Sequence, residues 1–112
     1  MELETGYSGR SFVVRCLEDR IDAANSTQFR DDMRTVTAAA SGTVILDLSR
    51  VEFLDSSGLG AVVAAMKSLA PDRRLELAAP TPNVQRVFRL TRMDTVFTIH
   101  PDVPKMGKTD AA

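Results

Sequence analysis

One stretch of the chain, residues 44–60, limits the possible folds more than any other part of the sequence. It opens with an apolar run, residues 44–48, in which Asp47 is the only charge. Such runs of β-branched and large aliphatic residues are typical of strands buried on both faces of a parallel sheet. Residues 55–57, Asp-Ser-Ser, then offer oxygen atoms to the free backbone N–H groups of a helix start. From Leu59 on, the apolar residues repeat with the period of a helix. The stretch therefore predicts strand, loop and helix.

The two faces of the helix predicted from residue 59 differ in character. One face is a continuous apolar stripe made of Leu59, Val62, Val63, Met66, Leu69 and Ala70. The opposite face carries the small residues Gly60, Ala61, Ala64 and Ser68, and Lys67 is the only charge between residues 59 and 70. A solvated helix face normally carries several charges. This small-residue face is therefore either covered by the rest of the domain or a docking surface for a partner, and both interpretations stay open.

The rest of the chain predicts a β-hairpin followed by alternating helices and strands. A turn at Ser8-Gly9 separates the first two strand patterns, and Asn25 and Thr81 stand at N-cap positions. Strands are expected at residues 1–7, 11–17, 44–48, 75–79 and 96–99. Helices are expected at residues 25–40 and 82–91, and from the Asp-Ser-Ser start at residues 55–57 to residue 70. This order indicates an α/β domain in which right-handed crossovers join parallel strands.

Length and composition favour one globular domain without covalent cross-links. The 112 residues are enough for a single core of ordinary size. Cys16 is the only cysteine, so it cannot form an internal disulfide, and it lies on the apolar side of its strand as a buried thiol would. Beyond a domain over residues 1–100, two prolines, one glycine and no periodicity predict a flexible C-terminal tail over residues 101–112.

The charge and hydropathy patterns argue against several classes of partner. A net charge of −1 gives no general reason to expect contact with nucleic acid or with an anionic membrane. No apolar run is long enough to cross a bilayer, and the N-terminus has no basic segment followed by an apolar one. The cytoplasm is therefore the expected compartment.

The sequence lacks the motifs of common catalytic and cofactor sites. His100 is the only histidine and lies far in sequence from Ser56, so nothing specific supports a Ser-His-Asp site. Gly58-Leu59-Gly60 has Val63 where a dinucleotide fingerprint needs its third glycine, and no Gly-Lys-Ser/Thr loop occurs. An isolated Cys16 and an isolated His100 do not make a metal-ligand cluster. We expect no enzyme activity, no cofactor and no metal.

The stretch described first also resembles the signature of a known family. Residues 45–48, Ile-Leu-Asp-Leu, and 53–60, Phe-Leu-Asp-Ser-Ser-Gly-Leu-Gly, are similar to the signature of the STAS-domain anti-sigma-factor antagonists, the SpoIIAA/RsbV-like proteins. The resemblance runs from about residue 12 to residue 99 and includes Arg20-Ile21-Asp22 and residues 82–91. It implies the STAS fold, a single α/β domain whose helices pack against a mixed β-sheet.

In that family, the serine directly after the signature aspartate is phosphorylated by an anti-sigma kinase. The resemblance therefore implies that Ser56 is the phosphoacceptor. A helix N-terminus suits a phosphate because it offers free N–H groups and a partial positive charge. Helix capping alone also selects Asp-Ser-Ser at a helix start, and this is the structural alternative for Ser56. Ser57 is expected to remain a cap or contact residue.

The resemblance also implies a partner surface around the serine. It places Asp22 and Asp55 close to the partner. Together with the small-residue face, this gives a predicted partner-binding set of Asp22, Asp55, Ser57, Gly58, Gly60, Ala61, Ala64 and Ser68. Asp19 and Arg20 stand where the family usually has Gly-Glu, so a turn or cap role is the alternative for Asp22.

The function implied by the resemblance is bacterial transcription regulation by an anti-sigma-factor antagonist that works through partner switching. The unphosphorylated protein would bind a serine kinase of the histidine-kinase-like ATPase fold and free the factor that this kinase restrains. Phosphorylation of Ser56 would weaken the complex, and a PP2C-type phosphatase would reset it. One alternative is a STAS subunit of a transporter complex of the lipid-transport ABC type, which needs no phosphate on Ser56. Another is a small-ligand sensor, although no convergent polar pocket can be read from the sequence.

Overall fold

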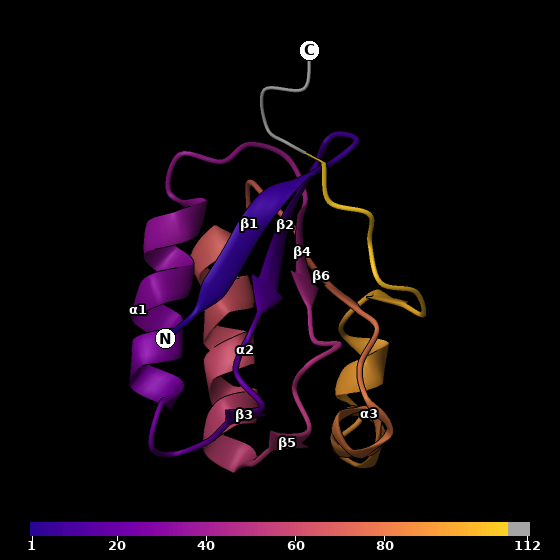
Figure 1. The fold of residues 1–112 in the computed structure, drawn as a ribbon. Coiled ribbons are helices and arrows are strands. Elements are labelled where there is room, and N and C mark those ends of the chain that lie inside the picture. Colours follow the sequence, from indigo (N-terminus) through magenta and orange to yellow (C-terminus); the bar gives the residue numbers. More distant parts are fainter. Residues whose placement is uncertain (108–112) are drawn as a thin grey trace.

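A computed structural model describes residues 1–107 of the chain (Figure 1). Its elements follow the predicted order, with two short strands, Arg20–Ile21 and Phe53–Leu54, that were not predicted. The strands are β1 (Leu3–Ser8), β2 (Ser11–Cys16), β3 (Arg20–Ile21), β4 (Val44–Asp47), β5 (Phe53–Leu54), β6 (Leu75–Ala78) and β7 (Ile99–His100). The α-helices are α1 (Ser26–Thr37), α2 (Ser56–Leu69) and α3 (Pro82–Leu90), and a short 3-10 turn spans Met93–Thr95.

The strands form one mixed sheet and one short ribbon. The main sheet has the order β1-β2-β4-β6-β7. Its first two strands are an antiparallel hairpin, and β2, β4, β6 and β7 run parallel. The strands β3 and β5 pair separately as a parallel ribbon at the lower end of the molecule in Figure 1. The predicted α/β architecture with a mixed sheet is therefore confirmed.

Two helices cover one face of the main sheet. Helices α1 and α2 pack against each other behind the sheet in Figure 1, while α3 lies beside β5. The core between these layers draws on every helix, and its largest fully buried side chains include Phe29, Phe88, Ile21, Met33, Leu46 and Leu77. Burying an apolar side chain of this size stabilises the fold by roughly 1.5–3 kcal/mol relative to leaving it exposed. Packing of these side chains thus fixes the position of each helix in the domain.

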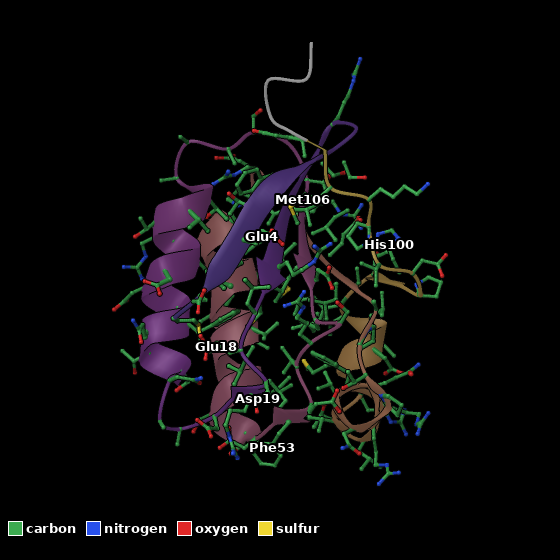
Figure 2. The ribbon with its side chains drawn as sticks, viewed as in Figure 1. Glu4, Glu18, Asp19, Phe53, His100 and Met106 are labelled. Carbon is green, nitrogen blue, oxygen red and sulfur yellow. The ribbon has the colours of Figure 1, made fainter. Side chains whose placement is uncertain are left out.

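The opposite face of the sheet contacts residues 101–107. The backbone N–H of Gly107 donates to the carbonyl oxygen of Tyr7 over 2.8 Å, and Met106 lies against Gly6 (Figure 2). The Arg15 guanidinium donates to the carbonyl oxygen of Pro104 over 3.3 Å. These contacts belong to the first part of the predicted tail, and residues 108–112 lie outside the described range. The domain boundary at residue 100 and the flexibility of the tail stay predictions.

Asp47, the one charge in the central strand, is fully buried and paired. Its Oδ2 accepts a hydrogen bond from Nε of Arg15 at 2.6 Å, and its Oδ1 accepts one from the backbone N–H of Ser49 at 2.9 Å. The hydrogen bond to Asp47 raises the pKa of Arg15 above its ordinary value. Removing Arg15 would leave the fully buried Asp47 carboxylate without its charged partner, at a cost of several kcal/mol. The Arg15–Asp47 pair therefore fixes β2 against β4.

Two element boundaries differ from the sequence prediction near the N-terminal half. Ser8 pairs with Ser11, so the hairpin turn consists of Gly9-Arg10 rather than Ser8-Gly9. Gly9 has a φ of +61°, a conformation that glycine adopts without strain. Helix α1 ends at Thr37 instead of Ala40, because the N–H groups of Ala38 and Ala40 bond to carbonyl oxygens only three residues back. The Arg73 guanidinium donates to the carbonyl oxygens of Thr37 and Ala40. A contact from so distant a residue leaves no local signal.

The last strand also differs from the prediction. It covers Ile99–His100, whereas strand residues were expected from Val96. The 3-10 turn Met93–Thr95 precedes it, and Phe97 turns inward and packs edge-on against Phe88 at a ring-centroid distance of 5.9 Å. Because Phe97 packs into the core, the strand begins only at Ile99.

Burial makes Cys16 a slow nucleophile. Its side chain is fully buried, and desolvation raises the pKa of the thiol from an ordinary 9.0 to about 11. At pH 8, about one thiol in 1,000 is then ionised in the native protein, against about one in ten in the unfolded chain. We expect a disulfide reagent to modify Cys16 at least about 100-fold more slowly in the native protein than in guanidinium chloride. Equal rates in the two conditions would show that the thiol is accessible.

Candidate functional site

The predicted phosphoacceptor lies where the β3–β5 ribbon leads into α2. The ribbon pairs Arg20 with Phe53 and Ile21 with Leu54. Ile21 and Leu54 point into the core and are buried. Because side chains alternate along a strand, the residues on either side of them lie on the outer side of the ribbon. These outer residues are Arg20, Asp22, Phe53 and Asp55.

Asp55 joins the start of α2 to the segment that precedes α1. It is the N-cap residue of α2, and its Oδ1 accepts a hydrogen bond from the backbone N–H of Gly58 at 2.8 Å. Its Oδ2 accepts one from the backbone N–H of Ala23 at 3.1 Å. An N-cap of this kind is typically worth about 1 kcal/mol, and the negative charge also suits the helix N-terminus. The carboxylate therefore fixes the first turn of α2 in position.

Gly58 allows that turn to approach the ribbon closely. It is buried, and a Cβ added at this position would overlap the backbone carbonyl group of Ile21. Backbone atoms of a core strand cannot move aside as the end of a flexible side chain can. Gly58 was predicted as a partner contact. In the structure it is a positioning residue, because it lets the first turn of α2, which carries Ser56, lie against the ribbon.

Ser56 and Ser57 are both exposed at the start of α2. They occupy the first turn, where backbone N–H groups have no acceptor within the helix. The N–H of Gly58 is bonded to Asp55, while those of the two serines have no acceptor among the described residues. The Ser56 hydroxyl is therefore accessible to another protein and lies beside groups that favour an anion.

Asp22 takes part in a tight turn before α1. Its Oδ1 accepts from the backbone N–H of Ala24 at 3.0 Å, and its Oδ2 accepts from Nε of Arg20 at 2.7 Å. Asn25 is the N-cap residue of α1, as predicted, but its side chain does not cap the helix. Its Oδ1 accepts instead from the backbone N–H of Asp22, and its Nδ2 donates to the Arg20 carbonyl oxygen. Asp22 thus stabilises a turn, which was the alternative role predicted for it. Its side chain remains 17% exposed.

The structure adds a pair of exposed residues that sequence reasoning missed. The guanidinium of Arg20 lies 5.0 Å from the centre of the Phe53 ring, and Phe53 is 46% exposed at the lower end of the molecule (Figure 2). Exposed aromatic and arginine side chains are enriched among the residues that dominate protein interfaces. The sequence did contain a signal for this contact. Arg20-Ile21-Asp22 and Phe53-Leu54-Asp55 both place an aliphatic residue before an aspartate, a pattern that suits two paired strands.

The small-residue face of α2 is divided between the core and the surface. Ala61 is 2% exposed and packs in the core. At this position the helix is covered by its own domain, so Ala61 is not available to a partner, contrary to the prediction. Gly60 is exposed with open space around it. Ala64 is half-buried and Ser68 is exposed, and both line a groove beside α1. Helix α2 packs on α1, and three residues of the predicted apolar stripe, Leu59, Val63 and Met66, are only half-buried.

The described residues offer little for other chemistry. Within residues 1–107, no group of three His, Cys, Asp or Glu side chains is placed to hold a metal ion. In the same range, none of the helices has the length and apolar character needed to cross a bilayer. Nε2 of His100 lies 2.8 Å from Oε1 of Glu76, and Figure 2 places His100 well away from Phe53. The histidine and the exposed serines therefore do not form one site.

Comparisons with known proteins agree with the fold. A family model described as the STAS domain matches residues 8–106. BtrV of Bordetella bronchiseptica, which is named as an anti-sigma factor antagonist, is 26% identical over 88 residues, covering 78% of this chain and 76% of BtrV.

Solved structures give the same result. An anti-sigma factor antagonist from Mycobacterium paratuberculosis has a TM-score of 0.78 and 26% identity, over 89% of this chain and 85% of that one. Unphosphorylated SpoIIAA, an anti-sigma factor antagonist, has a TM-score of 0.64 and 25% identity over 88% and 87% of the two chains. Phosphorylated SpoIIAA from Bacillus has a TM-score of 0.59 and 24% identity over 88% and 90%, a likeness of fold alone.

The two glycines of the first turns of α2 should respond oppositely to the same substitution. Gly58→Ala forces a Cβ against the Ile21 carbonyl and should destabilise the protein by at least about 2 kcal/mol. Gly60→Ala enters open space within a helix and should stabilise it by about 0.5–1 kcal/mol. Urea unfolding measures both free energies. Similar effects of the two substitutions would contradict the close approach at Gly58.

Proposed function

The chain belongs to the STAS domain family, and on this basis we propose that it is an anti-sigma-factor antagonist that works by partner switching. One observation carries the proposal: Ser56 is exposed on the first turn of α2, which Asp55 and Gly58 hold in a fixed position. Support also comes from similarity to BtrV and to the Mycobacterium paratuberculosis protein, which are both named as antagonists.

In this proposal the chain is a substrate and a ligand rather than a catalyst. Unphosphorylated, it binds a serine kinase of the histidine-kinase-like ATPase fold and frees the factor that the kinase restrains. The kinase then transfers the γ-phosphoryl group of ATP to Ser56. A bond forms between Oγ and phosphorus, the bond to the β–γ bridging oxygen breaks, ADP leaves, and a base on the kinase takes the serine proton. A PP2C-type phosphatase later hydrolyses the phosphoserine.

Electrostatics explains how one phosphate weakens the complex. A phosphoserine carries a charge of about −1.5 to −2 at neutral pH. In the free domain, the first-turn N–H groups and the partial charge of the helix favour it. At an interface, the phosphate follows directly after Asp55 in the chain and faces a surface that had bound a neutral hydroxyl. The added charge must then be desolvated or repelled, so it opposes binding and leaves the fold in place.

The site of phosphorylation tests the proposal. We would purify each protein of the histidine-kinase-like ATPase fold from the organism that encodes this chain and incubate it with the chain and Mg-ATP. One of these kinases should phosphorylate Ser56, as mapped by mass-spectrometric fragmentation. The reaction should persist in Ser57→Ala and disappear in Ser56→Ala.

Phosphate found only on Ser57 or on a threonine would refute the assignment of Ser56. A chain isolated from its own cells without phosphate, in a stable complex with a transporter ATPase, would instead support the alternative of a transporter subunit.

A further inference from the structure

A groove separates α1 from α2 on the outer surface of the domain. It has a volume of about 170 Å³. Ala64, Ala65 and Ser68 of α2 line one side, and Arg30 and Arg34 of α1 line the other. The α2 side therefore offers small side chains and one hydroxyl, while the α1 side offers two guanidinium groups.

The two arginines carry positive charge that is not neutralised within the described part of the domain. Both are exposed, and they lie one helical turn apart on the same side of α1. Among residues 1–107, the ion pairs involve other basic groups, namely the N-terminal amine, Arg15, Arg20, Arg74 and His100. Two acidic residues lie between the arginines in sequence: Asp32 pairs with the N-terminal amine, and Asp31 is exposed and forms no ion pair among the described residues. The groove therefore presents two guanidinium groups that no carboxylate of the described residues binds.

The groove continues the surface that carries the phosphoacceptor. Ser57, Gly60, Ala64 and Ser68 follow one another along α2 at spacings of three or four residues, which places them on one side of the helix. Gly60, between the serines and the groove, has no side chain to interrupt this surface. A protein that contacts Ser56 can therefore extend along α2 into the groove.

We propose that the groove binds an acidic segment of the kinase that phosphorylates Ser56, with a Glu or Asp side chain between Arg30 and Arg34. Guanidinium groups bind carboxylates through paired, charge-assisted hydrogen bonds, and the small residues opposite leave room for the incoming chain. The inference rests on the proposed function, because the occupant is the same partner. It assigns a specific chemistry to one part of that partner.

The test is a charge reversal with a matched control. Arg30→Glu combined with Arg34→Glu should raise the dissociation constant for the kinase, measured by calorimetry in the presence of ADP, at least tenfold. Arg86→Glu combined with Arg89→Glu makes the same change of charge at two exposed positions of α3 and should change it less than threefold. Circular dichroism melting of both variants verifies that they fold. Ser56→Asp serves as the reference for the proposed function and should also weaken binding.

The outcomes separate the two proposals. Suppose that Arg30→Glu with Arg34→Glu binds the kinase as tightly as the wild type, while Ser56→Asp binds more weakly. This result would refute the binding of an acidic segment in the groove and leave the proposed phosphorylation switch standing. Equal losses in the α1 and α3 variants would show a general charge effect and would also overturn the groove. If the unmodified chain does not bind the kinase, both proposals fail. A photo-crosslinking residue at position 68 gives a second reading, since it should mark a kinase segment that contains Asp or Glu, and marking of a segment without either would contradict the inference.

Discussion

The hydrogen bonds of the Asp55 carboxylate hold the candidate site together. One oxygen accepts from Gly58 at the start of α2, and the other accepts from Ala23 just before α1. The same turn presses Gly58 against the Ile21 carbonyl, so the ribbon, both helices and Ser56 meet at one place. A hydroxyl on an unsupported helix end would fray with its helix, since the first N–H groups have no intrahelical acceptor. Here the capping carboxylate and the close contact give the exposed serine a defined position.

This arrangement separates residues that build the domain from residues that meet other molecules. Gly58 and Ala61 are buried, and Gly58 lets α2 approach the ribbon closely. Ser56, Gly60 and Ser68 lie on the exposed side of the same helix. Because the second group carries little of the packing, a change of charge there can alter binding at small cost to stability. A switch that acts through the surface needs this division.

Local sequence signals predicted the centre of the fold better than its long-range contacts. Asp-Ser-Ser placed the start of α2 correctly, because its cap bond joins residues only three apart. The end of α1 was misplaced, and Arg73, distant in sequence, binds carbonyl groups there. The burial of Ala61 depends on how α2 packs in the core, and the Arg20–Phe53 contact depends on the pairing of β3 with β5. These are contacts between residues far apart in the sequence, and the periodicity of a single segment cannot predict them.

Amide hydrogen exchange tests most directly the central claim that phosphate on Ser56 acts as surface charge on an unchanged fold. Exchange would be compared between the unphosphorylated protein and the protein phosphorylated on Ser56, with circular dichroism of both forms. The account predicts the same fold, with changes in protection confined to residues 55–60, where the first turn of α2 meets the phosphate. Loss of protection across the main sheet or in α1 and α3 would contradict it, because the switch would then work by unfolding.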